Sequence, residues 1–125
     1  PISSLMTSPV VSVGMDDTVQ AVQALMSQHK LSWVPVVEPE GAPVGVIALS
    51  DLVQFHARDG DPAAVSAWQI CHYKPISVAA ATSVAEVARQ MLAHKIHHVV
   101  VTKDGAMVGV VSALDFVRRF VLEVG

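Results

Sequence analysis

The residues best suited to chemistry stand where an apolar run ends, near the C-terminus. Gly109-Val110-Val111-Ser112 is followed by Asp115, just ahead of an amphipathic helical pattern. We expect Ser112 at the exposed carboxyl end of a strand and Asp115 in the first turn of the next helix. Unpaired N–H groups at a helix start attract phosphate. The hydroxyl can donate to a phosphate oxygen and the carboxylate can accept from ribose hydroxyls. The same spacing is also typical of a plain helix cap, so both interpretations stay open.

The chain repeats itself, which gives this pattern weight. With a shift of 65 residues, Ser12-Val13 matches Ser77-Val78, Val19 and Val22 match Val84 and Val87, Met26 matches Met91, His29-Lys30 matches His94-Lys95, and Val34 and Val36 match Val99 and Val101. After one residue is lost in a loop, the shift becomes 64, and Gly45 and Asp51 match Gly109 and Asp115. Matches spread over a whole period indicate an internal duplication.

Hydrophobic periodicity predicts the same elements in both halves. The first half reads as a helical turn at 2–6, a strand at 10–13, a helix from a cap at Asp17 or Thr18 to about His29, strands at 33–37 and 44–48, and a helix from 49 to about 56. The second half reads as a partly helical lead-in at 63–71, a strand at 76–78, a helix opened by the capping-box pattern of Ser83 and Glu86, strands at 98–102 and 107–112 around Asp104-Gly105, and a last helix. The buried stripes of the second-half helices are expected at Val84, Val87, Ala88, Met91 and Leu92, and at Phe116, Val117, Phe120 and Val121.

Each repeat is therefore strand, helix, strand, strand, helix, and the fold class is α+β. A three-stranded sheet with two helices on one face leaves its other face uncovered. We expect a first repeat at 1–58 and a second at 67–125, joined by a linker over 59–66, to pack sheet to sheet about a pseudo-twofold axis. Such a module has two equivalent clefts between its repeats.

Composition and charge argue against several classes of protein. Of 125 residues, 52% are hydrophobic and 15% are charged, which excludes disorder and suggests buried apolar surface, including surface between subunits. A net charge of −3 without a basic cluster argues against nucleic acid as a partner. Apolar runs stay well short of the ~18–20 residues of a membrane span, so we expect no direct membrane insertion. Pro1 suggests a trimmed chain, and a single cysteine, Cys71, indicates a reducing compartment such as the cytoplasm.

At this point the pattern resembles a tandem pair of cystathionine-β-synthase (CBS) domains, also called a Bateman module. The resemblance covers essentially the whole chain. It is carried by Leu5-Met6-Thr7-Ser8-Pro9-Val10, Val34-Pro35-Val36-Val37, Gly45-Val46-Ile47-Ala48-Leu49-Ser50-Asp51, His97-His98-Val99-Val100-Val101 and Gly109 through Asp115. It implies regulatory binding of AMP, ADP, ATP or S-adenosylmethionine, with no required cofactor. In this family the Asp binds the ribose, and the Ser or Thr three residues before it contacts phosphate or ribose.

The resemblance implies two unequal sites. The first combines Ser112 and Asp115 with Leu31, Ser32 and Trp33, and with the segment from Met6 to Val11. The second combines Asp51 with Ile96, His97 and His98, and with the segment from Cys71 to Ile76. Ala48 takes the hydroxyl position of the second site, so we favour the first for ribose recognition. Trp33 either stacks on adenine or fills its pocket, and His97 and His98 neutralise phosphate in the second site or between the two.

Structural alternatives stand beside each of these roles. Both aspartates suit a helix cap, and Ser112 suits an ordinary strand end. Adjacent histidines on a strand point to opposite faces, so one of His97 and His98 is expected to face away from a given cleft. The spacing of His94, His97 and His98 suits zinc, but no thiol or carboxylate accompanies them. Cys71 reads as a small buried hydrophobe, and Trp68 and Phe120 read as core or dimer-interface residues.

The leading prediction is a nucleotide-sensing regulatory homodimer without catalysis, which passes ligand binding to a regulated enzyme or transporter domain. The alternative is a structural dimerisation module with empty clefts, which Ala48 and Trp33 motivate. A hydrolase using His97, His98 and Asp115 is the third hypothesis, and the sequence shows no nucleophile–base–orienter set for it.

Overall fold

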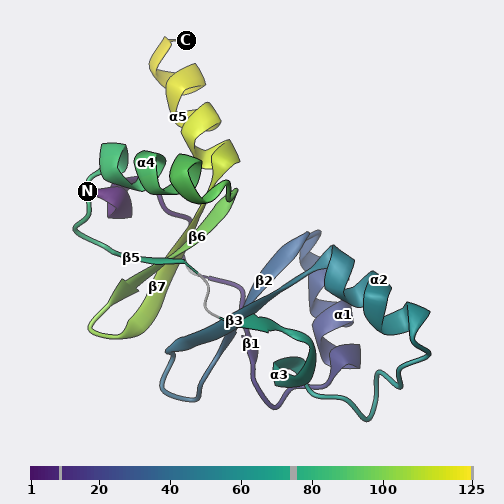
Figure 1. Ribbon diagram of the computed structural model, residues 1–125. Helices are drawn as coiled ribbons and strands as arrows, with labels where there is room; N and C mark the ends of the chain where they lie inside the picture. The colour runs from purple at the N-terminus through teal and green to yellow at the C-terminus, as the bar shows by residue number, and fades with distance from the viewer. Residues whose placement is uncertain (9, 74–75, 125) are drawn as a thin grey trace. The chain divides into compact units, whose positions relative to one another are not determined.

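A computed structural model describes the backbone of residues 1–8, 10–73 and 76–124 and the side chains of residues 1–8, 10–72 and 76–119. The chain forms two compact units (Figure 1). Unit 1 consists of Pro1–Val10 and Ile76–Gly125, and unit 2 of Val11–Pro75. Residues 1–10 therefore belong to the same compact unit as most of the second repeat, and the residues up to 75 belong to the unit of the first repeat. The repeat boundaries themselves, and the packing of one sheet on the other, stay predictions.

Unit 2 holds the first repeat. Its elements are β1 (Val13–Gly14), α1 (Val19–His29), β2 (Trp33–Val37), β3 (Pro43–Ala48), α2 (Leu49–Ala57), α3 (Ala67–Ile70) and β4 (His72–Tyr73). The sheet order is β1-β2-β3-β4, with β1 parallel to β2 and the other pairs antiparallel. The predicted helices and the two long strands are confirmed to within about two residues. The predicted strand at 10–13 is displaced, because only Val13 and Gly14 pair with β2.

Unit 1 holds the second repeat. Its elements are the 3-10 helix η1 (Ile2–Ser4), β5 (Ser77–Ala79), α4 (Val84–His94), β6 (His98–Lys103), β7 (Ala106–Ser112) and α5 (Ala113–Val124). The sheet order is β5-β6-β7, with β5 parallel to β6 and β6 antiparallel to β7. Asp104 and Gly105 both have positive φ, 54° and 81°, as a tight primed turn requires. The order β-α-β-β-α is thus confirmed in both repeats.

The long helices begin as the sequence predicts, with one difference. Thr18 Oγ1 accepts the Ala21 N–H at 3.1 Å, and Ser83 Oγ accepts the Glu86 N–H at 3.1 Å. The predicted capping box at Ser83 is only half formed, because the Glu86 carboxylate bonds Arg89 and Gln90 on its own helix. The ion pair with Arg89 competes with the return bond to the N-cap and lowers the pKa of Glu86.

Each unit has its own core of valine, isoleucine and methionine. Unit 1 buries Ile2, Val78, Val87, Met91, Val99, Val101 and Val111, and unit 2 buries Val13, Val19, Val22, Met26, Val34, Val36, Ile47, Leu52 and Phe55. Two expected core positions are wrong: Leu92 is 79% exposed and Val117 is 54% exposed. Val84, Val87 and Met91 are the α4 side chains in or against the core, and Leu92 lies about 100° round the helix from Met91. Phe116 is partly buried, and the side chains of Phe120 and Val121 lie outside the described residues.

A short edge segment adds to each sheet, which the sequence analysis did not predict. In unit 2, β4 pairs with β3 through Gly45↔Tyr73 and Val46↔His72. In unit 1, Thr7 makes the equivalent bridge to Val110, with N–H···O distances of 2.8 and 3.3 Å. A two-residue strand has no periodicity to read. The bridge repeats because Thr7 and His72 are 65 residues apart, the period of the duplication.

Two glycines permit this close edge pairing. A Cβ at Gly45 would lie 2.5 Å from the His72 carbonyl oxygen and 2.7 Å from Cys71 Sγ. A Cβ at Gly109 would lie 2.8 Å from Met6 Cγ. Heavy atoms do not approach so closely, so a side chain at Gly45 would displace the edge backbone, whereas a side chain at Gly109 would require the Met6 side chain to move. Met6 and Cys71 are themselves one period apart.

We predict that Gly45→Ala destabilises the chain more than Gly109→Ala, both by about 1–3 kcal/mol. The reason is that Gly45 faces a backbone oxygen, whereas Gly109 faces the flexible Met6 side chain. Urea unfolding measures both. Gly14→Ala is the control, since its Cβ would meet its nearest atom at an ordinary 3.5 Å. Equal losses of stability in all three variants would contradict the close-approach argument.

Candidate functional site

Asp115 lies where β7 passes into α5, as the sequence predicts. Its Oδ2 accepts the backbone N–H of Ser112 at 2.7 Å and the Ser112 hydroxyl at 3.2 Å. The Asp115 side chain is only 10% exposed. Its other oxygen, Oδ1, lies 3.9 Å from the guanidinium of Arg118 on the next turn, which is too long for a hydrogen bond. Asp115 is therefore a helix cap that keeps one carboxylate oxygen available for another donor.

Asp51 occupies the equivalent junction between β3 and α2. Its Oδ2 accepts the backbone N–H of Ala48 at 2.8 Å. Ala48 offers no hydroxyl, so the second bond that Ser112 makes is missing here. Asp51 Oδ1 instead pairs with Nε2 of His72 from β4. The two aspartates thus share one backbone role and differ in what surrounds the second oxygen.

The strand beside each junction carries the next candidates. In unit 1, His98 lies directly across from Ser112, and the Ala113 N–H donates to the His97 carbonyl at 2.8 Å. In unit 2, Trp33 lies across from Ala48, and the Leu49 N–H donates to the Ser32 carbonyl at 3.2 Å. The two junctions have the same backbone geometry. The junction in unit 1 carries His98 and Ser112, and the junction in unit 2 carries Trp33 and Ala48.

His98 is held toward its neutral form. Partial burial lowers the pKa of His98 from its ordinary 6.5, the neighbouring His97 lowers it further, and the Asp115 carboxylate raises it in opposition. The folded state therefore binds fewer protons than the unfolded chain just below pH 6.5. The stability that neutral His98 contributes is present above that pH and is lost as the pH falls toward the folded-state pKa.

The structure groups the predicted site residues by unit. Unit 1 brings Ser112, Asp115, Ile96, His97 and His98 to one end of the β6–β7 pair, with Ala113 N–H closing onto His97. Unit 2 holds Leu31, Ser32, Trp33 and Asp51 in the same relation. Val11 belongs to unit 2 and Ile76 to unit 1, where each is partly buried ahead of the first strand. The predicted combinations of Asp115 with 31–33 and of Asp51 with 96–98 join residues of different units and stay predictions.

Hollows lie beside both groups. In unit 1, a hollow of about 440 Å³ between α4 and α5 is lined by Ala88, Met91, Leu92, Lys95, Ile96, His97, Ala113 and Phe116. In unit 2, a smaller and more polar hollow of about 220 Å³ is lined by Asp51, Gln54, Phe55, Arg58, Gly60, Gln69, Ile70, Cys71 and His72. Ile96 and His97 thus open onto an apolar surface, and Asp51 onto a polar one.

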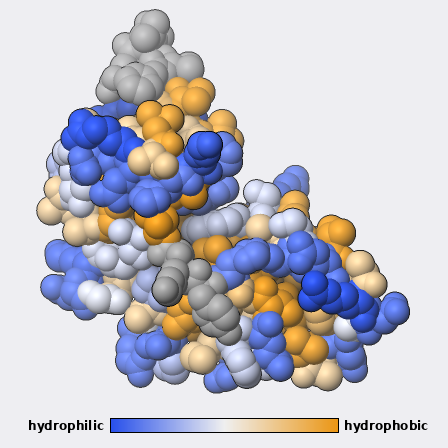
Figure 2. All heavy atoms as spheres, viewed as in Figure 1, coloured by the Kyte–Doolittle hydropathy of each residue, from blue (hydrophilic) through white to orange (hydrophobic). Residues whose placement is uncertain are grey.

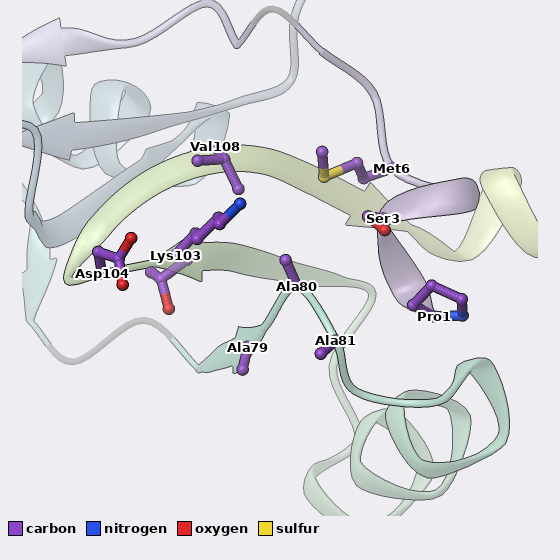
Figure 3. A pocket seen from close by; sticks show the side chains of 10 residues that line it. Pro1, Ser3, Met6, Ala79, Ala80, Ala81, Lys103, Asp104 and Val108 are labelled. Carbon is purple, nitrogen blue, oxygen red and sulfur yellow. The ribbon is translucent and has the colours of Figure 1, made fainter.

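Met6 belongs to unit 1, and its predicted contribution to the Asp115 site stays a prediction. Met6 lines a third hollow of about 610 Å³, with Lys103 and Asp104 of the hairpin at one end and Pro1 and Ser3 at the other (Figure 3). This hollow contains neither Ser112 nor Asp115. Within unit 1, Met6 therefore serves the packing of the N-terminal segment over Gly109.

Two residues near the aspartates were not singled out from the sequence. His72 fell inside the predicted segment Cys71–Ile76 without a role of its own, and Arg118 was not considered. The duplication aligns Thr7 with His72, and this alignment is the sequence signal that could have drawn attention to His72. Cys71 is buried as expected. Burial raises the pKa of its thiol, a backbone hydrogen bond opposes this, and the Asp51 charge adds to the rise.

Two further features concern the part of the chain that the structure describes. Among its residues, no three or more His, Cys, Asp and Glu side chains gather as a metal site. No helix in the described part is both long and apolar enough to cross a membrane.

Comparison with known proteins finds CBS domains in both repeats. A family model described as the CBS domain matches residues 2–58 and 67–122. CBSX3, a mitochondrial CBS domain-containing protein of Arabidopsis thaliana, is 32% identical over 113 residues, covering 86% of this chain and 55% of that protein. Protein MJ1404 of Methanocaldococcus jannaschii is 26% identical over 94% of this chain and 31% of its own length. The chain thus spans only about a third to a half of these relatives.

Solved structures share the fold. The CBS domain of a membrane protein from Sphaerobacter thermophilus is 31% identical, with a TM-score of 0.80 over 94% of this chain and 86% of that one. Three more distant neighbours are a bacterial CNNM/CorC-family Mg²⁺ transporter domain in complex with ATP, CBSX2 in complex with AMP, and MJ0100 in complex with 5′-methylthioadenosine and S-adenosyl-L-methionine. They are 20–24% identical, with TM-scores of 0.83–0.84 over 97–99% of this chain and 87–98% of theirs. The α+β fold predicted from the sequence is that of a CBS-domain pair.

We predict that Asp115→Asn lowers the pKa of His98 further, because the carboxylate charge that favours the imidazolium is removed. The amide oxygen of Asn can still accept the Ser112 N–H, so the helix cap is kept. NMR titration of the His98 imidazole carbons measures the shift. Asp104→Asn, in the exposed hairpin turn, is the control. An unchanged or raised His98 pKa in Asp115→Asn would show that the two groups do not interact.

Proposed function

Because the chain belongs to the CBS-domain family and carries two copies of the domain, we propose that it is a regulatory module that binds an adenosine ligand. The candidates are AMP, ADP, ATP and S-adenosylmethionine, and the module performs no catalysis of its own. Neighbours of the same fold bind AMP, ATP and S-adenosylmethionine, which supports this ligand class.

The single observation that carries the proposal is the arrangement at Asp115. A nearly buried carboxylate at a strand-to-helix junction keeps Oδ1 for a further donor, because Oδ2 already serves the Ser112 N–H. A ribose hydroxyl is a suitable donor for that oxygen, since hydrogen bonds to a charged acceptor are the stronger ones. Ser112 and His98 stand beside it with a hydroxyl and an imidazole. His97 is exposed and is a candidate for contact with phosphate.

The regulatory step follows from linkage. A ligand shifts the relative arrangement of the two repeats only as far as it binds one arrangement better than another. We propose that residues of both repeats contact the ligand, so that binding changes their relative orientation and a regulated enzyme or transporter domain responds. We assign the module to a reducing compartment such as the cytoplasm, on the single buried cysteine.

Homodimerisation is part of the same proposal. Large apolar side chains are open to solvent on the helices of both units. They are Leu49 and Val53 on α2, Trp68 on α3, Leu92 on α4, and Leu114 and Val117 on α5. Figure 2 shows hydrophobic residues among the hydrophilic ones at the surface. Leu49 and Val53 share one face of α2, and Leu114 and Val117 share one face of α5, and exposed apolar faces mark interaction surfaces. They also favour the second candidate function, a structural dimerisation module that binds no nucleotide.

We predict that one adenosine compound raises the unfolding temperature of the chain and that Asp115→Ala removes the rise. A ligand at ~100 times its dissociation constant adds ~2.7 kcal/mol, or several degrees for a chain of this size. The experiment compares millimolar AMP, ADP, ATP, S-adenosylmethionine and GTP. Each variant is referred to its own ligand-free midpoint, because Asp115→Ala also loses the cap.

The control is Asp104→Asn, which should keep the full rise. Light scattering on the same samples gives the oligomeric state. A dimer that shows no shift with any compound would contradict the sensor and favour the dimerisation module. A rise that persists in Asp115→Ala would place the ligand elsewhere.

A further inference from the structure

The two aspartates are equivalent in the duplication but not in their second oxygen. In both, Oδ2 accepts the N–H of the residue that ends the strand, at 2.8 Å for Asp51 and 2.7 Å for Asp115. That bond is part of the helix start, so Oδ1 is the oxygen each carboxylate can offer a ligand. The surroundings of Oδ1 therefore decide whether a ribose can bind.

At Asp51 this oxygen is already occupied. Nε2 of His72 pairs with Oδ1, and the Asp51 side chain is only 4% exposed. Either protonation state of the imidazole can supply this contact, because Nε2–H donates in the imidazolium and in one neutral tautomer. At Asp115 the second oxygen lies 3.9 Å from the guanidinium of Arg118. His72 and Arg118 are similarly exposed, 65% and 69%, but at 3.9 Å the guanidinium makes no hydrogen bond, so it holds Oδ1 more weakly than the imidazole holds Oδ1 of Asp51.

His72 is placed there by the edge strand. Its pairing with Val46 in β4 fixes the backbone beside β3, and the missing side chain of Gly45 lets that backbone come close. In unit 1 the same edge position is taken by Thr7, which pairs with Val110 and carries no cation. Of the side chains that differ between the two junctions, His72 is the one that reaches the second carboxylate oxygen of Asp51, and its counterpart Thr7 carries no charge.

We propose that His72 closes the Asp51 carboxylate to ribose, so that the chain binds one adenosine ligand, at Asp115. This inference rests on the proposed function and names the residue that makes its two candidate sites unequal. A ribose at Asp51 must first displace the imidazole from an almost buried carboxylate. We therefore expect no binding at Asp51 over the range of ligand concentration that saturates the Asp115 site.

The test is isothermal titration of the full chain with AMP, ATP and S-adenosylmethionine in separate experiments. Wild type should show one binding event per chain. His72→Thr, which installs the residue of the other repeat, should show two. The variant should fold, because His72 is mostly exposed and threonine suits a strand. His29→Thr, an exposed histidine at the end of α1 in the same unit, is the matched control and should keep one event.

Two further variants separate the missing hydroxyl from the blocking imidazole. Ala48→Ser alone should keep one event, and His72→Thr with Ala48→Ser should give two, the second tighter than in His72→Thr. Two events in wild type, or one in both His72→Thr variants, would overturn the proposal. No binding by wild type with one event in His72→Thr would refute the Asp115 site and uphold the block. No binding by either would refute both.

Discussion

Asp115 and Asp51 each hold the N–H of the residue that ends a strand, and the rest of each unit is arranged around that bond. The bond turns the chain from β7 into α5 and from β3 into α2 with a carboxylate at the junction. Because one oxygen suffices for the turn, the other can meet a ligand. One aspartate can therefore cap the helix with one oxygen and bind a ligand with the other. The two roles that the sequence left open, helix cap and ribose contact, are compatible.

The edge segments connect this junction to the duplication. Each edge segment lies against a long strand, β3 in unit 2 or β7 in unit 1, because a glycine of that strand, Gly45 or Gly109, leaves room for it. The side chain that follows the close contact then stands at the sheet edge, and it is His72 in one unit and Thr7 in the other. A duplication that keeps the backbone while exchanging this one side chain yields two carboxylates with different availability.

Much of this was readable from the sequence. The repeat, the order of elements and the positions of Asp51 and Asp115 followed from periodicity and the 64- to 65-residue shift, because these patterns are local. Leu92 and Val117 were misplaced because apolar residues on a helix read as core, even where they lie beyond the line that meets the sheet. The bridge of Thr7 to Val110 and the pairing of His72 with Asp51 join residues that are distant in sequence. No window of local sequence shows such contacts, so they needed the structure.

The central claim is that an adenosine ligand binds at the start of α5 through Asp115. The most direct measurement is an NMR titration of the ¹⁵N-labelled chain with AMP or ATP, which follows the backbone amides. The account predicts that the largest changes fall on Ser112 and the first turn of α5, with smaller changes at residues 31–33 and little change at the start of α2. Saturable changes confined to other segments, or no changes at millimolar ligand, would contradict it.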